Sequence, residues 1–202
     1  SFQAGQFVML QLLNPDGSMW AQRAYSIANA PCEGKSVVEL GIKVAGEFTQ
    51  RVSQLGVGDK VNVRGPYGTF TLQQHDGPFV FFAGGIGIMP IRCMIRELLL
   101  SGKKCEVFLF YSSKTREAIA YEDDLRELAA QHDNFYPTFC LTQETVEGWT
   151  GECQRVNVDL VKRYFSEFSH AHFYMCGPVP FMDAVKEMLE SEKVDLSDCL
   201  KQ

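Results

Sequence analysis

A glycine-rich turn in the middle of the chain could bring backbone amides to a phosphate or a polar cofactor. It follows a continuous apolar run at residues 79–83, which is typical of a strand buried on both faces. The turn contains Gly84, Gly85 and Gly87. Pro90 then opens a run with helical periodicity. A strand that turns sharply into a helix presents free N–H groups and the positive end of the helix dipole to a ligand, and glycine lets that ligand approach closely. A tight turn without a ligand would have the same pattern.

A second turn of the same design lies near the end of the chain. Cys176-Gly177-Pro178 follows an apolar strand and precedes a helix. Because ligands of parallel sheets bind beyond the carboxyl ends of the strands, the two turns would form one crevice. We expect the thiol of Cys176 to face that crevice, unlike the other cysteines, although a small residue at a crowded turn is the alternative. No histidine is placed in sequence to activate it, so we do not interpret it as a nucleophile.

Two segments of the N-terminal third have the groups that a flavin nucleotide needs. Arg23-Ala24-Tyr25-Ser26 places a cation, an aromatic ring and a hydroxyl along one predicted strand. These would serve the phosphate, the isoalloxazine ring and N5, but an ordinary half-buried strand has similar residues. Gly46-Glu47-Phe48-Thr49 puts glycine and a hydroxyl at a predicted helix start, which suits a pyrophosphate or a plain threonine cap.

A loop in the second half bears on the choice between NAD and NADP. Ser112-Ser113-Lys114-Thr115-Arg116 follows the second strand predicted there. An acidic residue at that point would bind a ribose 2′-hydroxyl, whereas cations suit a 2′-phosphate. The loop has two cations and no acid before Glu117, which favours NADP, although solvated loops often have this composition.

The elements that must position these groups differ between the two parts of the chain. Residues 1–76 contain short strands with glycine and proline turns, which is typical of an antiparallel barrel. Residues 77–202 alternate strands and helices, which predicts a parallel sheet covered on both faces. The predicted strands are 7–12, 23–28, 37–44, 61–64, 69–72, 79–83, 105–111, 136–141 and 172–176. The predicted helices are 48–55, 90–101, 121–131, 157–165 and 180–191.

The composition is that of an ordinary soluble globular protein, with 46% hydrophobic residues and a formal net charge of −6 over 202 residues. The negative charge argues against a nucleic-acid partner. The seven cysteines include no CxxC pair and the four histidines have no metal-ligand spacing, so we expect neither a disulfide framework nor a metal site. Free thiols, and the lack of an apolar run or leader for a membrane, favour a cytoplasmic location.

With these motifs in order, the chain resembles the ferredoxin–NADP reductase superfamily of flavin oxidoreductases over nearly its whole length. The resemblance implies an FAD-binding Greek-key β-barrel followed by an NAD(P)-binding α/β domain. It also implies hydride transfer from NAD(P)H to FAD, with electrons passed on to a partner protein or domain. The segments that carry the resemblance are Arg23-Ala24-Tyr25-Ser26, Gly46 to Thr49, Gly65-Pro66-Tyr67-Gly68-Thr69-Phe70, Gly84 to Pro90, and Cys176-Gly177-Pro178 with Met182.

The resemblance assigns roles to individual residues. Tyr25 would stack on the isoalloxazine ring, Ser26 would bond near N5, and Arg23 would bind a phosphate. The candidate catalytic residues are therefore Tyr25, Ser26 and Cys176. The pyrophosphate would be held by Gly46, Phe48 and Thr49, and the nicotinamide by Gly85, Gly87 and Cys176. The further cofactor-binding candidates are Gly84, Pro90, Ser113, Arg116, Gly177, Pro178 and Met182.

The chain departs from the family pattern at three places. Met89 stands where the family usually has threonine or a small residue. We also expect the first barrel strand, and the terminal aromatic residue that often covers the flavin, to lie outside this sequence. These departures leave two alternatives: a module without catalysis, or an electron-transfer subunit of a larger redox complex. The sequence does not identify the electron acceptor.

Overall fold

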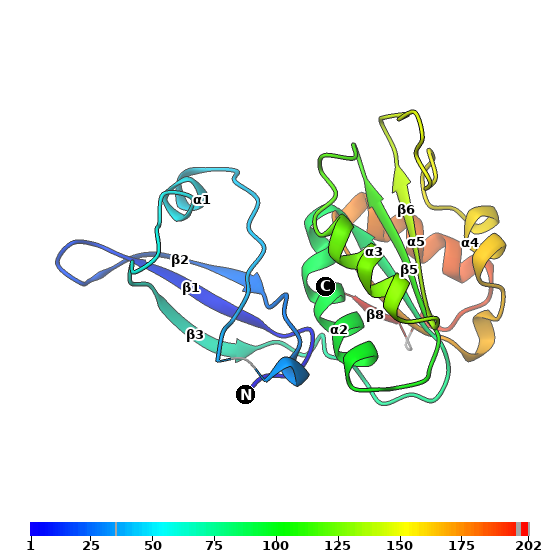
Figure 1. Ribbon diagram of the computed structural model, residues 1–202, viewed down its shortest axis with the longest axis horizontal. Coiled ribbons are helices and arrows are strands. Elements are labelled where there is room, and N and C mark those ends of the chain that lie inside the picture. The colour runs from blue at the N-terminus through cyan, green and yellow to red at the C-terminus, as the bar shows by residue number, and fades with distance from the viewer. Residues whose placement is uncertain (35, 197–198, 202) are drawn as a thin grey trace.

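The computed structural model describes residues 1–34, 36–196 and 199–201. Figure 1 shows an antiparallel sheet formed by the N-terminal part of the chain beside a layered α/β unit formed by the rest. This arrangement confirms the predicted order of an antiparallel domain followed by a parallel α/β domain. We refer to the two parts as the N-terminal half and the C-terminal half.

The N-terminal half is built on a sheet with strand order β2-β1-β3. Its strands are β1 (Phe7–Leu13), β2 (Met19–Ser26) and β3 (Asn62–Tyr67). Val8, Leu10 and Leu12 recur with the period of two that places side chains on one face of a strand, and all three are buried. The short helix α1 (Glu47–Val52) covers this sheet through Phe48, which packs in one cluster with Leu10 and Leu12.

Residues 37–44, predicted as a strand, form no regular strand: Leu40 makes an isolated antiparallel bridge with Ile27, and the rest of the segment is a loop. The side-chain amide of Asn29 donates to the carbonyl of Val37 (3.1 Å) and accepts from the N–H of Glu39 (2.8 Å). A side chain thus occupies backbone groups that a neighbouring strand would otherwise bond. Alternating apolar residues predict a strand only where no side chain competes for the backbone hydrogen bonds of the segment.

Two other N-terminal predictions also fail. Residues 69–72 lie outside the sheet, because the N–H of Leu72 donates to the carbonyl of Ala4 (3.0 Å) and Phe70 packs on Tyr174 of the C-terminal half. The turn expected at Gly65-Pro66-Tyr67-Gly68 is largely replaced by β3, which continues to Tyr67. The segment that joins the two halves is therefore shaped by contacts with the second half.

The C-terminal half is a five-stranded parallel sheet with strand order β6-β5-β4-β7-β8. Its strands are β4 (Phe79–Gly84), β5 (Val107–Ser113), β6 (Phe135–Leu141), β7 (His172–Cys176) and β8 (Cys199–Lys201). The helices are α2 (Ile88–Leu100), α3 (Glu122–Gln131), α4 (Val158–Tyr164) and α5 (Val179–Ser191). Short 3-10 turns occur at Pro31–Glu33, Gly85–Gly87 and Phe168–His170.

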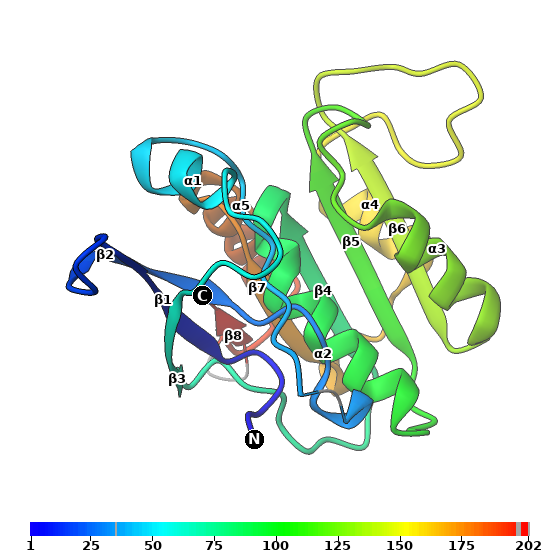
Figure 2. The ribbon, with the colours of Figure 1, turned by 60° about the vertical axis from the view of Figure 1, so that its left-hand side comes forward.

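The four helices cover both faces of the parallel sheet, as predicted. Residues of α2 and α3 pack in one buried cluster and those of α4 and α5 in another, and Figure 2 shows the two pairs of helices on opposite sides of the strands. The edge strand β8 was not predicted, because three residues carry no measurable periodicity. None of the helices in the described part of the chain is both long enough and apolar enough to cross a lipid bilayer.

Helix α2 is the element shared by the two halves. Figures 1 and 2 both place it between the antiparallel sheet and the parallel sheet. Ala28 and Phe70 of the N-terminal half belong to the same buried cluster as Ile91 and Met94 of α2. A helix that is apolar on nearly all sides must be covered on all sides, and α2 meets this requirement by burial between the two halves.

Candidate functional site

A cavity of about 490 Å3 opens where β4, β5 and β6 end, at the edge of the sheet where ligands of such folds bind. The turn after β4 contributes Gly84, Gly85 and Ile86, and the start of α5 contributes Pro178 and Phe181. The structure thus brings the two predicted glycine turns together at one cavity.

The glycines of these turns serve two different purposes. A Cβ on Gly87 would collide with the carbonyl group of Cys176. A Cβ on Gly177 would lie 2.9 Å from the Cα of Gly84. These positions therefore require glycine because the two turns pack backbone against backbone. Gly85 has a φ of 53° and open space where a Cβ would point, so it is the glycine at which a ligand can approach the backbone.

Cys176 does not have the exposure that the sequence suggested. Its side chain is buried in the core shared by the two halves, and the residue is only 9% exposed. Burial raises the pKa of its thiol to about 11, so the thiol is protonated at neutral pH. The expectation that Cys176 differs from the buried cysteines is wrong, whereas its contact with a nicotinamide stays a prediction.

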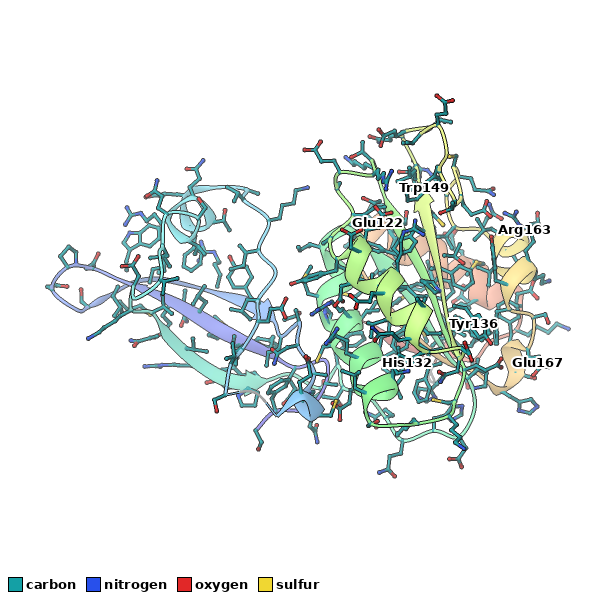
Figure 3. All side chains as sticks on the ribbon, viewed as in Figure 1. Glu122, His132, Tyr136, Trp149, Arg163 and Glu167 are labelled. Carbon is teal, nitrogen blue, oxygen red and sulfur yellow. The ribbon has the colours of Figure 1, made fainter. Side chains whose placement is uncertain are left out.

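The two cations of the predicted 2′-phosphate loop separate in the structure. Lys114 lines the cavity together with Ser113, which is buried. Arg116 lies at a different hollow, where its Nε donates to Glu122 (3.3 Å) and its guanidinium carbon lies 5.6 Å from the ring centre of Trp149. Figure 3 shows Glu122 and Trp149 near each other at one end of the C-terminal half. Lys114 is therefore the cation of this loop that borders the cavity.

Other predicted residues of the C-terminal half are placed around the cavity rather than in it. Pro90 is buried in the first turn of α2, and Met182 packs against the cluster on the far face of the sheet. Phe181, which we did not predict, lines the cavity in place of its neighbour Met182. Lys43 was also missed, because it comes from the N-terminal half and no motif marks it.

The predicted flavin residues other than Ser26 meet at a second hollow of about 270 Å3 in the N-terminal half. Both flavin segments contribute to it, through Arg23 and Tyr25 from β2, and through Gly46, Phe48 and Thr49 at the start of α1. Ser26 is half-buried at the end of β2, where it pairs with Phe7 in the strand ladder.

The chemistry of this hollow suits an aromatic ring with an attached phosphate. The rings of Tyr25 and Phe48 are stacked with centres 6.2 Å apart, and the guanidinium carbon of Arg23 lies 5.5 Å from the centre of the Phe48 ring. Burial raises the pKa of the Tyr25 phenol, so its hydroxyl remains a hydrogen-bond donor at neutral pH. The hydroxyl of Thr49 accepts from the N–H of Ala45 (2.8 Å) and donates to the carbonyl of Gly46 (3.0 Å), which fixes the loop that enters α1.

One loop borders both the cavity and the hollow. Lys43 lines the cavity and Ala45, two residues later, lines the hollow. Two such residues are separated by about 7 Å at most, so the two sites adjoin across this loop. Tyr25 and Cys176 do not line a common cavity, and the link between the sites is made by the loop instead. Among the residues that the structure describes, no group of three or more potential metal ligands lies together.

The chain matches two protein-family models that cover most of its length. An oxidoreductase FAD-binding domain matches residues 1–72, and an oxidoreductase NAD-binding domain matches residues 81–187. The hollow and the cavity lie mainly within these respective regions.

Curated relatives and solved structures agree with the family models. The chain is 36% identical to the reductase component DmpP of phenol 2-monooxygenase from Pseudomonas sp., over 91% of this chain and 52% of that protein. It is 32% identical to one subunit of the Na(+)-translocating NADH-quinone reductase of Actinobacillus pleuropneumoniae, over 86% of this chain and 46% of that protein. The chain thus spans about half the length of these relatives.

The fold is similar to that of the cytochrome b5 reductase domain of Ulva prolifera nitrate reductase, with a TM-score of 0.86, 22% identity, and coverage of 100% of this chain and 86% of that one. The Amycolatopsis cytochrome P450 reductase GcoB gives a TM-score of 0.82 and 25% identity, over 100% of this chain and 60% of that one. With FAD-binding and NAD-binding domains in this order and on this fold, the chain belongs to the ferredoxin–NADP reductase superfamily of oxidoreductases.

Proposed function

We propose that this chain is a reductase that accepts hydride from NAD(P)H on bound FAD and delivers the electrons to a partner protein. The observation that carries the proposal is the adjacency of the two sites across the loop from Lys43 to Gly46. Transfer between two cofactors requires that their binding sites meet, because proximity and orientation supply much of the rate.

The residues present fit both groups. The hollow offers Arg23 for a phosphate and the half-buried ring of Tyr25 for an aromatic system. The cavity offers the open backbone of Gly85 and two cations, Lys43 and Lys114, for the phosphates of a dinucleotide. FAD, when bound, supplies the hydride acceptor; the protein contributes binding, alignment and exclusion of water.

The electron acceptor is proposed from the relatives. One relative is the reductase component of phenol 2-monooxygenase and the other is a subunit of an NADH-quinone reductase, so both names describe parts of larger redox systems. We infer that this chain likewise supplies electrons to another protein or domain. A cytoplasmic setting is supported by the free thiols of Cys32, Cys93, Cys105, Cys140, Cys153 and Cys176.

The proposal is tested by the visible spectrum of the purified protein incubated with FAD. We expect a bound-flavin spectrum that bleaches when NADH or NADPH is added without oxygen. Failure to retain any FAD, or retention of FAD that neither nucleotide reduces, would favour the module without catalysis. Separate titrations with the two nucleotides give the preference between them.

Substitution of Lys114 with glutamine is expected to weaken NADPH binding by about 10- to 100-fold, because a hydrogen bond to a charged group contributes roughly 1.5–3 kcal/mol. The affinity for NADH should change much less, since it lacks the 2′-phosphate. Arg116→Gln is the matched control from the same loop, where Arg116 already pairs with Glu122. Equilibrium titration of each nucleotide measures both effects. The result would contradict this assignment if Lys114→Gln left the ratio of NADPH affinity to NADH affinity unchanged while Arg116→Gln lowered it. Arg116 would then be the residue that binds the 2′-phosphate.

A further inference from the structure

A network of charged side chains joins the two halves on the surface of α2. Arg92, on α2, is only 5% exposed. Its Nε and Nη2 donate to the two carboxylate oxygens of Asp124 on α3, at 2.8 and 3.2 Å. Its Nη1 donates across the boundary to the carbonyl of Ala28 (2.8 Å) and to Glu39 (3.3 Å). One guanidinium group therefore forms hydrogen bonds to α3 through one edge and to the N-terminal half through the other.

Two neighbouring side chains extend this network. Arg96, one turn further along α2, donates to Asp124 (2.8 Å) and to Glu33 of the N-terminal half (2.9 Å). The hydroxyl of Tyr121 donates to Glu39 (2.6 Å), and its ring lies 4.0 Å from the guanidinium carbon of Arg92. Burial, together with the hydrogen bond to Glu39, raises the pKa of Tyr121 to about 12, so the phenol stays a donor at neutral pH.

The network differs in kind from the apolar contact around it. Apolar burial between the halves is strong but non-directional, so it does not fix how one half is turned against the other. Forked, charge-assisted hydrogen bonds have strict geometry and are satisfied only in one arrangement. Replacement of Glu39 or Asp124 would take a partner from the buried guanidinium group of Arg92, which is costly. The network is therefore suited to setting the relative position of the halves.

The loop held by this network is the one that borders both binding sites. Glu39, bonded by Arg92 and Tyr121, lies four residues before Lys43 of the cavity. Between them, a Cβ on Gly41 would collide with the thioether of Met89 on α2. The large side chain of Met89 is thus accommodated by a glycine on this loop. Glu39 and Gly41 both fix the loop against α2.

We propose that Arg92, Glu39 and Tyr121 form an interdomain latch that holds the 39–46 loop in place and thereby aligns the flavin site with the nucleotide site. The inference rests on the proposed function, since the latch matters for catalysis only if two cofactors react across this loop. The latch residues touch neither site, so they are positioning residues. Their loss should slow transfer between the cofactors while each cofactor still binds.

The test uses two mild variants, Tyr121→Phe and Glu39→Gln, and the double variant. Each keeps the shape of the side chain, and Tyr121→Phe removes only the hydroxyl that bonds Glu39. Arg163→Gln is the control: Arg163, labelled in Figure 3, bonds Glu152 (2.9 Å), another residue of the C-terminal half. It removes an ion pair without touching the boundary.

We expect flavin reduction by NADH, followed by stopped flow, to slow by about 10-fold or more in the latch variants, because small misplacements of reacting groups are expensive. The dissociation constants of FAD and NADH should each stay within about 2-fold, and the charge-transfer absorbance between nicotinamide and flavin should weaken. Both variants weaken the hydrogen bond between Tyr121 and Glu39, since Tyr121→Phe removes the donor and Glu39→Gln removes the charge of the acceptor. The double variant should therefore be less impaired than the product of the single effects predicts. Arg163→Gln should reduce its flavin at the wild-type rate.

Thermal unfolding of the apoprotein, followed by calorimetry, tests the latch without any cofactor. The wild type and Arg163→Gln should unfold in one transition, and the double latch variant in two separate ones. One transition in the wild type, in Arg163→Gln and in the double latch variant, together with unchanged reduction rates, would overturn the latch. A wild type that binds no flavin would refute the proposed function alone, and the calorimetric result would still decide whether the latch couples the halves.

Discussion

Gly87→Ala is expected to lower the unfolding temperature of the apoprotein by about 5–10 °C. The φ of Gly87 is −61°, so alanine fits the backbone conformation, and the effect must come from space alone. The new Cβ would collide with the carbonyl group of Cys176 and lie 2.8 Å from the amide nitrogen of Gly177. These are backbone atoms and cannot rotate away. Overpacking of this kind costs about 1–3 kcal/mol, which corresponds to a few degrees per kcal/mol in a chain of this size.

Gly85→Ala is the matched control for this experiment. Its Cβ would point into open space, but Gly85 has a φ of 53°, which costs alanine about 1–2 kcal/mol. We expect a smaller drop in unfolding temperature and a larger loss of nucleotide affinity, because the methyl group would enter the cavity. Circular dichroism melts and equilibrium titration with NADH measure the two effects. Equal melting of Gly87→Ala and the wild type would mean that the two turns do not pack against each other.

The contrast between these glycines shows what the sequence could and could not reveal about the site. Strand, turn and helix order was predictable at both turns, because continuous apolar runs and glycines are local signals. The role of each glycine was not predictable, and all of these glycines were interpreted as positions where a ligand approaches the backbone. Gly87 and Gly177 instead face each other's turns, which are separated by some ninety positions in the chain. Such contacts depend on strand order, which the sequence does not encode locally.

The same limit explains the errors in the N-terminal half. Residues 37–44 alternate like a strand, but the side chain of Asn29 takes two of the backbone bonds at this loop. No sequence motif marks Lys43, because it lines the cavity only through the position of its loop against the C-terminal half. Arg92 lies in a mainly apolar helix, and its partners Glu39 and Asp124 are far from it in sequence. The family motifs predicted the sites, whereas the coupling between them required the structure.

Arg23→Gln is expected to weaken FAD binding by about 10- to 100-fold. Arg23 is exposed at the edge of the flavin hollow and has no carboxylate partner among the residues that the structure describes. Its guanidinium group donates to the carbonyl of Gln22 (2.7 Å), which leaves further donors for a phosphate. A hydrogen bond to a charged group contributes roughly 1.5–3 kcal/mol, and this range sets the expected change in the dissociation constant. Quenching of FAD fluorescence during titration gives the dissociation constant.

Arg64→Gln is the control for the loss of a positive charge from the same sheet, because Arg64 is an exposed residue of β3 that does not line the hollow. The salt dependence of binding separates a direct phosphate contact from a structural effect. FAD affinity of the wild type and of Arg64→Gln should fall as ionic strength rises, whereas that of Arg23→Gln should fall less, because the screened interaction has been removed. If Arg23→Gln and Arg64→Gln weaken FAD binding equally and keep the same salt dependence, then Arg23 acts only through net charge and another group binds the phosphate.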